Sequence, residues 1–247
     1  MENSIYIERD FGWFLGCFEN NRQHRHYAIQ LSIPINSFVD VELTEKNIST
    51  ESPVLIKPNI SHRITSNEEQ FLLLINPAST IGHFWNKTAA NTVSEINHPV
   101  IAALLAVIKD GALDTGERRS KINSLIKSYD CFCDSFIHQG DDRINKALGY
   151  LASQTNRVVP LDEIAGVCAL SPDRFLHLFK KETGMTYRRA QLWAKLVDAI
   201  PLMRNYSVTE TAHEAGFADS AHFSRTFREN FGFNPREVLK FSWFIQV

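Results

Sequence analysis

A weak internal repeat constrains the C-terminal part of this chain more than any other feature of its sequence. When the sequence is shifted by 48 residues, apolar, basic and glycine positions coincide. The coinciding pairs are Phe175 with Phe223, Phe179 with Phe227, Lys180 with Arg228, Gly184 with Gly232 and Arg188 with Arg236. Each copy follows a shorter helical segment, LDEIAGVCA or SVTETAHEAGF. A short helix, a tight turn and a second helix make a helix-turn-helix unit, so the repeat predicts two such units.

The second helix of each unit is amphipathic. We expect these helices over residues 171–183 and 219–231, capped by Ser171 and Asp219, with the repeated phenylalanines on the buried side. The opposite sides carry Asp173, Arg174, His177, Lys180 and Lys181 in the first helix and Ser220, Ala221, His222, Ser224, Arg225 and Arg228 in the second. A polar helix face is usually just solvated. Two such faces on the second helices of repeated units favour binding in the DNA major groove, where arginine is the commonest reader of guanine.

Residues 186–205 are expected to form one helix that connects the two units. Its apolar side is formed by Ala190, Trp193, Ala194, Val197 and Ile200. Such a helix would hold the two second helices about one DNA turn, roughly 34 Å, apart. Pro201 lies within it and is expected to remove a hydrogen bond and kink the helix, at a cost of about 3 kcal/mol.

Two segments, SPDRFLHLFKKETGMT (171–186) and GFADSAHFSRTFRENFGFNPRE (216–237), resemble the DNA-binding domain of the AraC/XylS family of bacterial transcription regulators. The resemblance covers about residues 141–240. It implies two helix-turn-helix units that bind a promoter or operator in double-stranded DNA, and it implies that the polar residues named above make the contacts. Ala169 stands where the family commonly has glycine, and Asp173 places an acid on the DNA-facing side.

The first hundred residues contain runs typical of β-strands, HYAIQLSIPI (26–35), SPVLIKP (52–58) and QFLLLINP (70–77). They predict a small antiparallel sheet or barrel, and the family resemblance implies a cupin-like domain here. The expected fold class is therefore α+β with two domains. Its parts are a cupin-like β sensor domain (1–97), a helical dimerisation segment (98–138) and an all-α domain with two helix-turn-helix units (139–247).

The segment between these domains predicts two helices, HPVIAALLAVIKDG and GERRSKINSLIKSYDCFCDSFI. The apolar stripe of the longer helix consists of Ile122, Leu125, Ile126, Tyr129, Phe132 and Phe136. This stripe is expected either to pack on the sheet or to form a homodimer seam through residues 115–137, and the two interpretations can coexist.

Histidines gather near the first of these strands. His24, His26, Ala28 and Gln30 are expected to alternate along one strand face, with His62 nearby. The histidines could form a metal site, a polar effector pocket or part of an ordinary sheet. Imidazole suits zinc, iron or nickel, but an enzymatic cupin typically adds a glutamate about four residues after the HxH pair, where this chain has YAIQ. Our prediction is an effector pocket formed by His26, Gln30 and His62, without a metal or cofactor.

The charge of the chain is unevenly divided. Residues 1–140 hold 12 Lys and Arg against 16 Asp and Glu, and residues 141–247 hold 14 against 12, which gives net charges of −4 and +2. The C-terminal part is thus mildly basic, as a DNA-binding domain can be. The cysteines Cys17, Cys131, Cys133 and Cys168 form no CxxC pair and are expected to be free thiols, with Cys168 in the core.

These features predict a sequence-specific transcriptional regulator and no enzyme. A metal-dependent cupin enzyme with an accessory helical domain is the alternative. The missing glutamate and the lack of a nucleophile–base arrangement disfavour it. The chain contains no run of eighteen apolar residues, so no membrane span is predicted. The acidic start MENSIYIERDFGW is unlike a signal peptide, so a cytoplasmic location is expected. The expected partners are DNA, a small-molecule effector, RNA polymerase and a second copy of the chain.

Overall fold

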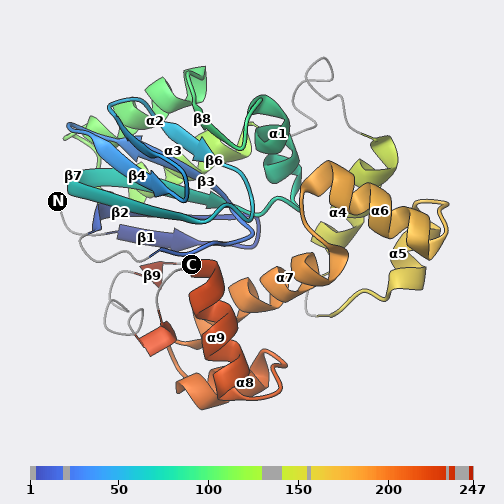
Figure 1. Cartoon of the computed structure of the whole chain (residues 1–247). Helices are drawn as coiled ribbons and strands as arrows, with labels where there is room; N and C mark the ends of the chain where they lie inside the picture. The colour runs from blue at the N-terminus through green and yellow to red at the C-terminus, as the bar shows by residue number, and fades with distance from the viewer. Residues whose placement is uncertain are drawn as a thin grey trace.

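The computed structural model describes residues 4–18, 23–129, 141–154, 157–231, 234–236 and 245–246. Its N-terminal part is a β-sheet with helices packed against it, and its C-terminal part is helical apart from one short strand near the end (Figure 1). This confirms the predicted α+β class and the division into a β-rich and a helical part. Cys131 and Cys133 lie outside the described residues.

The sheet is antiparallel except for one parallel pair among the described strands, β1 with β9. The strand order is β8-β6-β3-β7-β2-β1-β9, and β4 joins β5 to the first half of the long strand β7. The bounds are β1 Ser4–Ile7, β2 Phe11–Phe18, β3 Ile29–Pro34, β4 Val39–Leu43, β5 Asn47–Thr50, β6 Val54–Ile56, β7 His62–Ile75, β8 Val93–Glu95 and β9 Ile245–Gln246. The three predicted strands correspond to β3, β6 and the second half of β7.

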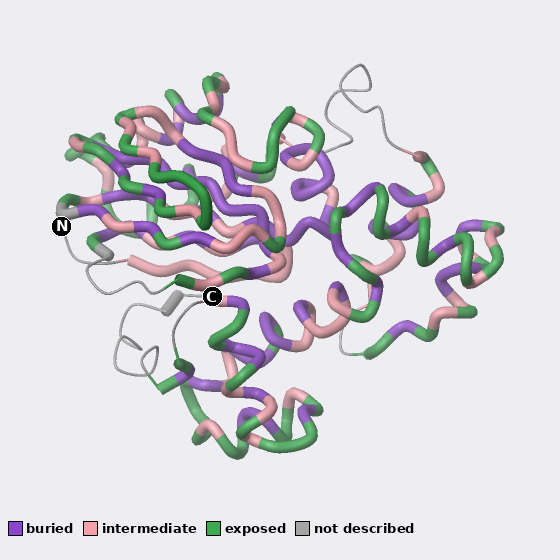
Figure 2. The backbone as a smooth tube through the Cα atoms, viewed as in Figure 1, coloured by how far each residue is buried: buried purple, intermediate pink, exposed green. Residues whose placement is uncertain are grey.

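Strand β3 is buried on both faces, because helices cover one side of the sheet and β4 lies near the other (Figures 1 and 2). Its odd-numbered residues, including Leu31, join a core with α2 (Pro99–Lys109) and α3 (Thr115–Lys127). Ile122 and Ile126 are buried in that same core. The predicted stripe of α3 therefore packs on the sheet, as one of the two interpretations held, and residues 130–137 lie outside the described part of the chain.

Helix α1 (Thr80–Thr88) was not predicted from the sequence. The Ser79 hydroxyl oxygen caps it by accepting a hydrogen bond from the Gly82 amide at 2.9 Å. Phe84 and Trp85 bury the helix against the sheet core. Its other side meets helices α4 and α6 of the C-terminal part, so α1 joins the two parts of the protein.

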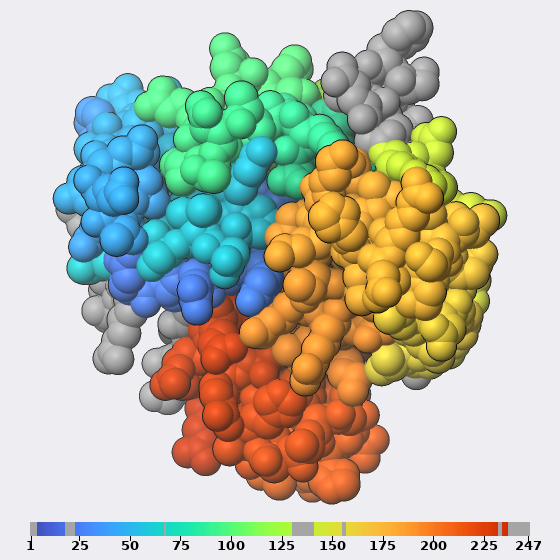
Figure 3. Space-filling model, turned by 45° about the vertical axis from the view of Figure 1, so that its right-hand side comes forward, coloured from blue at the N-terminus to red at the C-terminus, as the bar shows by residue number. Residues whose placement is uncertain are grey.

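The C-terminal helices follow the predicted order. They are α4 Asp142–Ser153, α5 Leu161–Val167, α6 Pro172–Thr183, α7 Tyr187–Leu202, α8 Val208–Glu214 and α9 Ser220–Phe231. The helix-turn-helix units are α5–α6 and α8–α9. They lie at the two ends of α7 and form separate lobes on the molecular surface (Figures 1 and 3). No helix in the described part of the chain has both the length and the apolar character needed to cross a membrane.

A buried carboxylate connects α6 to the sheet domain. Glu182 is 6% exposed, and its Oε2 lies 3.1 Å from Lys87 Nζ and 3.5 Å from His83 Nε2, both on α1. Asn86 donates a hydrogen bond to the Glu182 backbone carbonyl at 3.3 Å. Burial alone would raise the pKa of Glu182, but the hydrogen bond and charge of Lys87 bring that pKa below its usual value. The carboxylate is therefore ionised at neutral pH and helps to fix α6 against α1.

We expect Lys87→Met to destabilise the protein by about 1–2 kcal/mol at pH 7, because it leaves the buried Glu182 carboxylate without its nearest cation. Thermal melts of wild type and variant would measure this. The favourable contribution is present above the unfolded pKa of a glutamate and is lost as the pH falls through the lower folded pKa. The difference should therefore shrink below about pH 4. Lys109→Met, at an exposed lysine that ends α2, is the control; an equal effect there would contradict the assignment.

Candidate nucleic-acid interface and effector site

Each helix-turn-helix unit turns through one residue in the left-handed backbone region. Ala169 has a φ of 52° and Gly216 a φ of 70°. The next amide in each turn, of Leu170 or Phe217, donates to the carbonyl five residues back at 3.0 or 2.8 Å, which is a Schellman helix end. The turns thus coincide at an offset of 47 residues (169 and 216), whereas α6 and α9 coincide at 48 (172 and 220). The second turn is therefore one residue longer than the first.

The second helices bury their phenylalanines as expected. Phe175 and Phe179 on α6 and Phe223 and Phe227 on α9 are each no more than 1% exposed. Every polar residue singled out on α6 is exposed, namely Asp173, Arg174, His177, Lys180 and Lys181. On α9, Ala221, Arg225 and Arg228 are exposed and Ser220, His222 and Ser224 are half-buried. The two helices therefore present polar, largely basic faces, and the assignment of these residues to DNA contact stays a prediction.

The starts of the two helices differ in their capping. The Asp219 carboxylate accepts a hydrogen bond from the His222 amide at 2.6 Å, which confirms this N-cap. Ser171 occupies the N-cap position of α6, but its side chain makes no cap hydrogen bond. Asp173 lies in the first turn of α6, where a negative charge interacts favourably with the helix dipole. This acid thus has a structural role in stabilising the start of α6.

Leu176 is an exposed residue that the sequence analysis placed with neither face of α6. Its side chain is 37% exposed, and it lies three residues after Asp173 and four before Lys180. Helical spacing puts it on the same side as these polar residues. An apolar side chain on this face can contact a thymine methyl group, as apolar side chains do in the major groove. The helical spacing alone could have identified it.

The predicted effector residues come together inside the β domain. His26 Nε2 lies 2.8 Å and His62 Nε2 3.2 Å from the Gln30 side-chain oxygen, and all three residues are buried. Burial lowers the pKa of His26 to about 4 and that of His62 to about 3. Strand β3 begins only at Ile29, so the predicted alternation from His24 to Gln30 is wrong. Ala28 packs instead with Trp193 and Val197 of α7.

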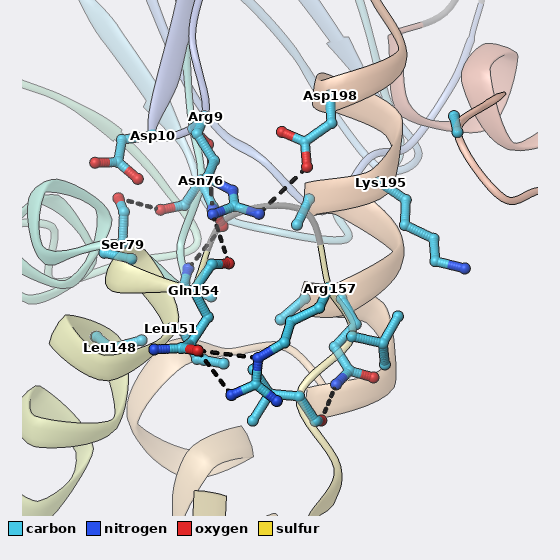
Figure 4. A pocket seen from close by; sticks show the side chains of 18 of the residues that line it. Arg9, Asp10, Asn76, Ser79, Leu148, Leu151, Gln154, Arg157, Lys195 and Asp198 are labelled. Carbon is cyan, nitrogen blue, oxygen red and sulfur yellow. Dashed lines mark hydrogen bonds and ion pairs between the residues drawn. The ribbon is translucent and has the colours of Figure 1, made fainter. Parts of the chain in front are cut away.

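A cavity of about 510 Å³ lies where the β1–β2 turn meets α4, α7 and the turn after α8. Figure 4 shows Arg9 reaching across it to Asp198, at 3.2 Å. The same guanidinium donates to the Gln154 carbonyl at 3.0 Å, and Arg157 pairs with Glu163. An anionic ligand would compete with these carboxylates for the arginines. No single stretch of sequence could predict this cavity, because its lining comes from many separate segments.

Comparison with known proteins finds similarity concentrated in the C-terminal part. The family model of a helix-turn-helix domain matches residues 164–240. The "HTH-type transcriptional activator RhaS" of Enterobacter sp. (strain 638) is 34% identical over 104 residues, which is 41% of this chain and 37% of that protein. The RhaS activator of Escherichia fergusonii is 39% identical over 100 residues, 40% of this chain and 36% of that protein. The chain thus matches little more than a third of the length of these relatives.

Solved structures resemble the chain over nearly its full length. A crystal structure of an apo ToxT variant from Vibrio cholerae has a TM-score of 0.59 at 14% identity, covering 94% of this chain and 97% of that one. Wild-type ToxT from Vibrio cholerae bound to an unsaturated fatty acid has a TM-score of 0.52 at 18% identity, covering 97% and 96%. At these identities the likeness shows the fold: a β-rich N-terminal part followed by a helical part.

The left-handed turn residues predict a pair of opposite effects on stability. A residue with a Cβ atom pays about 1 kcal/mol or more in this backbone region. We therefore expect Ala169→Gly to raise the melting temperature by about 2–4 °C and Gly216→Ala to lower it by a similar amount. A Cβ atom at Gly216 would come no closer than 3.6 Å to its nearest neighbour, so crowding does not confuse the comparison. Thermal melts that shift in the same direction for both variants would contradict this account.

Proposed function

We propose that the chain is a member of the AraC/XylS family of transcription regulators, and thus a sequence-specific DNA-binding regulator that acts in the cytoplasm and responds to an effector. The reading elements of the proposal are α6 and α9, each the second helix of its unit. The contacts to double-stranded DNA are assigned to the residues of α6 and α9 singled out from the sequence. The relatives described as transcriptional activators support this proposal, although they match the chain only in its C-terminal part.

One observation carries the proposal: two exposed basic helix faces are held at the two ends of one helix. Helices α6 and α9 each contain 12 residues, and each follows a Schellman turn. The exposed sides of the two helices carry basic residues, and the phenylalanines lie on the opposite, buried sides. The basic residues are Arg174, Lys180 and Lys181 on α6 and Arg225 and Arg228 on α9. Such faces suit two adjacent segments of the major groove, with arginine reading bases and lysine neutralising phosphates.

The N-terminal part is proposed to be the effector domain, with His26, Gln30 and His62 in the effector pocket. The fatty acid bound to the structurally similar ToxT supports regulation by a small molecule. The pocket residues lie close to the DNA-binding part, because Ala28, two residues from His26, packs on α7. Arg189 of α7 also lies over the Tyr27 ring, 4.8 Å from its centroid. An effector that contacts His26 would therefore lie only two residues along the chain from Ala28, which packs on the connecting helix.

The proposal includes a homodimer through residues 115–137, contact with RNA polymerase and the division at 1–97, 98–138 and 139–247. Ile122 and Ile126 are buried in the sheet core, and Leu125 and Tyr129 pack against it but are only half-buried, so their exposed parts are what α3 and the residue after its end could offer to a dimer seam. Sedimentation at micromolar concentration, with and without DNA, measures the oligomeric state directly. A monomer under both conditions would remove the dimer from the proposal.

Selection of bound sites from a genomic DNA pool tests the proposed function. We expect one or two short motifs separated by about one DNA turn, because α6 and α9 read adjacent segments. Binding should weaken as salt rises, since each neutralised phosphate releases counterions. Selection that enriches no sequence, or an affinity independent of salt, would contradict DNA binding by this protein.

Arg225→Ala should weaken binding to the selected site by about 1–3 kcal/mol and relax its preference at one position, because arginine contacts to guanine supply that specificity. The matched control is Arg63→Ala, which removes an exposed arginine from strand β7 of the sheet domain. Gel-shift titrations on the selected site and on single-base variants measure both quantities. Equal affinities for wild type and Arg225→Ala on every site would exclude Arg225 from the reading set.

A further inference from the structure

Three histidines and a glutamine converge on one point inside the β domain. His24 and His62 form an isolated bridge in which each backbone amide donates to the other residue's carbonyl, at 2.9 and 2.8 Å. This pairing holds the centroids of their rings 4.6 Å apart, and the centroid of the His26 ring lies 5.0 Å from that of His62. One ring nitrogen from each of the three histidines lies within 4.8 Å of the other two. The backbone thus brings His62 to His24 and His26, from which it is distant in sequence.

The hydrogen bonds of two of these rings fix which nitrogen carries the proton. His26 Nδ1 lies 3.0 Å from the Ala28 carbonyl oxygen and His62 Nδ1 2.8 Å from that of Ile60. A carbonyl oxygen only accepts, so both Nδ1 atoms donate, and in a neutral ring Nε2 then carries a lone pair. The backbone carbonyls therefore orient both rings as they do for metal-binding histidines.

Gln30 completes the cluster with a third acceptor. Its side-chain oxygen faces the Nε2 atoms of His26 and His62 at 2.8 and 3.2 Å, while its amide nitrogen donates to the Ser32 hydroxyl oxygen at 3.2 Å. In this arrangement three lone pairs point at one another within a buried space. A cation placed among them would turn this repulsion into coordination. Turning the amide over would instead satisfy both nitrogens with N–H donors, and this is the competing account.

We propose that His24, His26, His62 and Gln30 bind one divalent transition-metal ion. Three imidazoles and one amide oxygen form a neutral ligand set that suits zinc, cobalt or nickel. Metal–ligand bonds of about 2.1 Å in a tetrahedral site place the ligand atoms about 3.4 Å apart. Binding would therefore adjust the three ring nitrogens, which now lie within 4.8 Å of one another, and move the Gln30 oxygen outward from its 2.8 Å separation from His26 Nε2. Half-buried His24 gives the ion a path to the buried pair. This assigns a metal as the effector of the proposed regulator and replaces the metal-free pocket expected from the sequence.

The site adjoins the connecting helix. Ala28, whose carbonyl holds His26 Nδ1, packs on Trp193 and Val197 of α7. If the His26 ring moves when it binds a metal, the movement therefore takes place next to α7, the helix that connects the two helix-turn-helix units. Only this consequence rests on the proposed function; the binding of the metal does not depend on it.

The test is a titration of the full-length protein with Co²⁺ after dialysis against EDTA. We expect a saturable visible spectrum at one equivalent per chain, displaced by Zn²⁺, and a higher melting temperature with saturating Zn²⁺. His24→Ala and His62→Ala should each weaken Co²⁺ binding by roughly tenfold or more. The matched control is His213→Ala, at an exposed histidine of α8, and it should bind Co²⁺ like the wild type.

Gln30→Glu tests the cluster without removing a ligand. A carboxylate in place of the amide should tighten Co²⁺ and Zn²⁺ binding by roughly tenfold or more if the side-chain oxygen faces the ion. Circular dichroism and binding to the selected DNA show whether each variant is folded. A wild-type protein that binds DNA but shows no saturable Co²⁺ spectrum, or binding that both histidine variants retain, would overturn the metal site alone. Co²⁺ binding by a protein that selects no DNA would overturn the proposed function and leave the metal site.

Discussion

The structure depends on a connecting helix that is buried on several sides at once. Tyr187, near the start of α7, packs in the core of the first helix-turn-helix unit. Trp193 and Val197 pack on Ala28 of the sheet domain, and Ile200 packs in the core of the second unit. A helix apolar around most of its surface has to be surrounded, and here it is surrounded by three different cores. Helices α6 and α9 and the sheet domain therefore take their positions from α7.

The helical part could be predicted because its information is local. Periodicity, caps and turn residues lie within a few positions of one another, and they placed α6 and α9 within one residue of their observed starts. Ala169 stands where the family commonly has glycine, and the structure places it in the left-handed region. Even so, the repeat concealed the extra residue in the second turn, because the phenylalanines align at 48 and the turn residues at 47. The spacing of apolar side chains predicts where helices lie, but it does not predict the lengths of the loops between them.

The sheet part could be predicted only in outline, because its contacts are distant in sequence. Strand β7 extends from His62 to Ile75, and its first half pairs with β4 while its second half pairs with β2 and β3. No local pattern contains that pairing. The histidine cluster depends on it, since His62 meets His24 through the backbone bridge. The grouping of His26, Gln30 and His62 could be predicted from the sequence, but the predicted strand alternation was wrong and could not supply their geometry. Helix α1 was missed although Ser79 marks its start.

Pro201 was expected to kink the connecting helix, and the structure places it next to the end of that helix. It is the second-last residue of α7, where its missing amide leaves only the Val197 carbonyl without its helical hydrogen bond. The helix continues to Leu202, and Met203 donates to the Ile200 carbonyl at 3.1 Å. Of the α7 residues in the core of the second unit, Leu196, Ala199 and Ile200 come before this point, and Met203 follows directly after the helix. The buried residues Trp193, Val197 and Ile200 of α7 thus all lie on the N-terminal side of the proline, which stands one residue before the helix end.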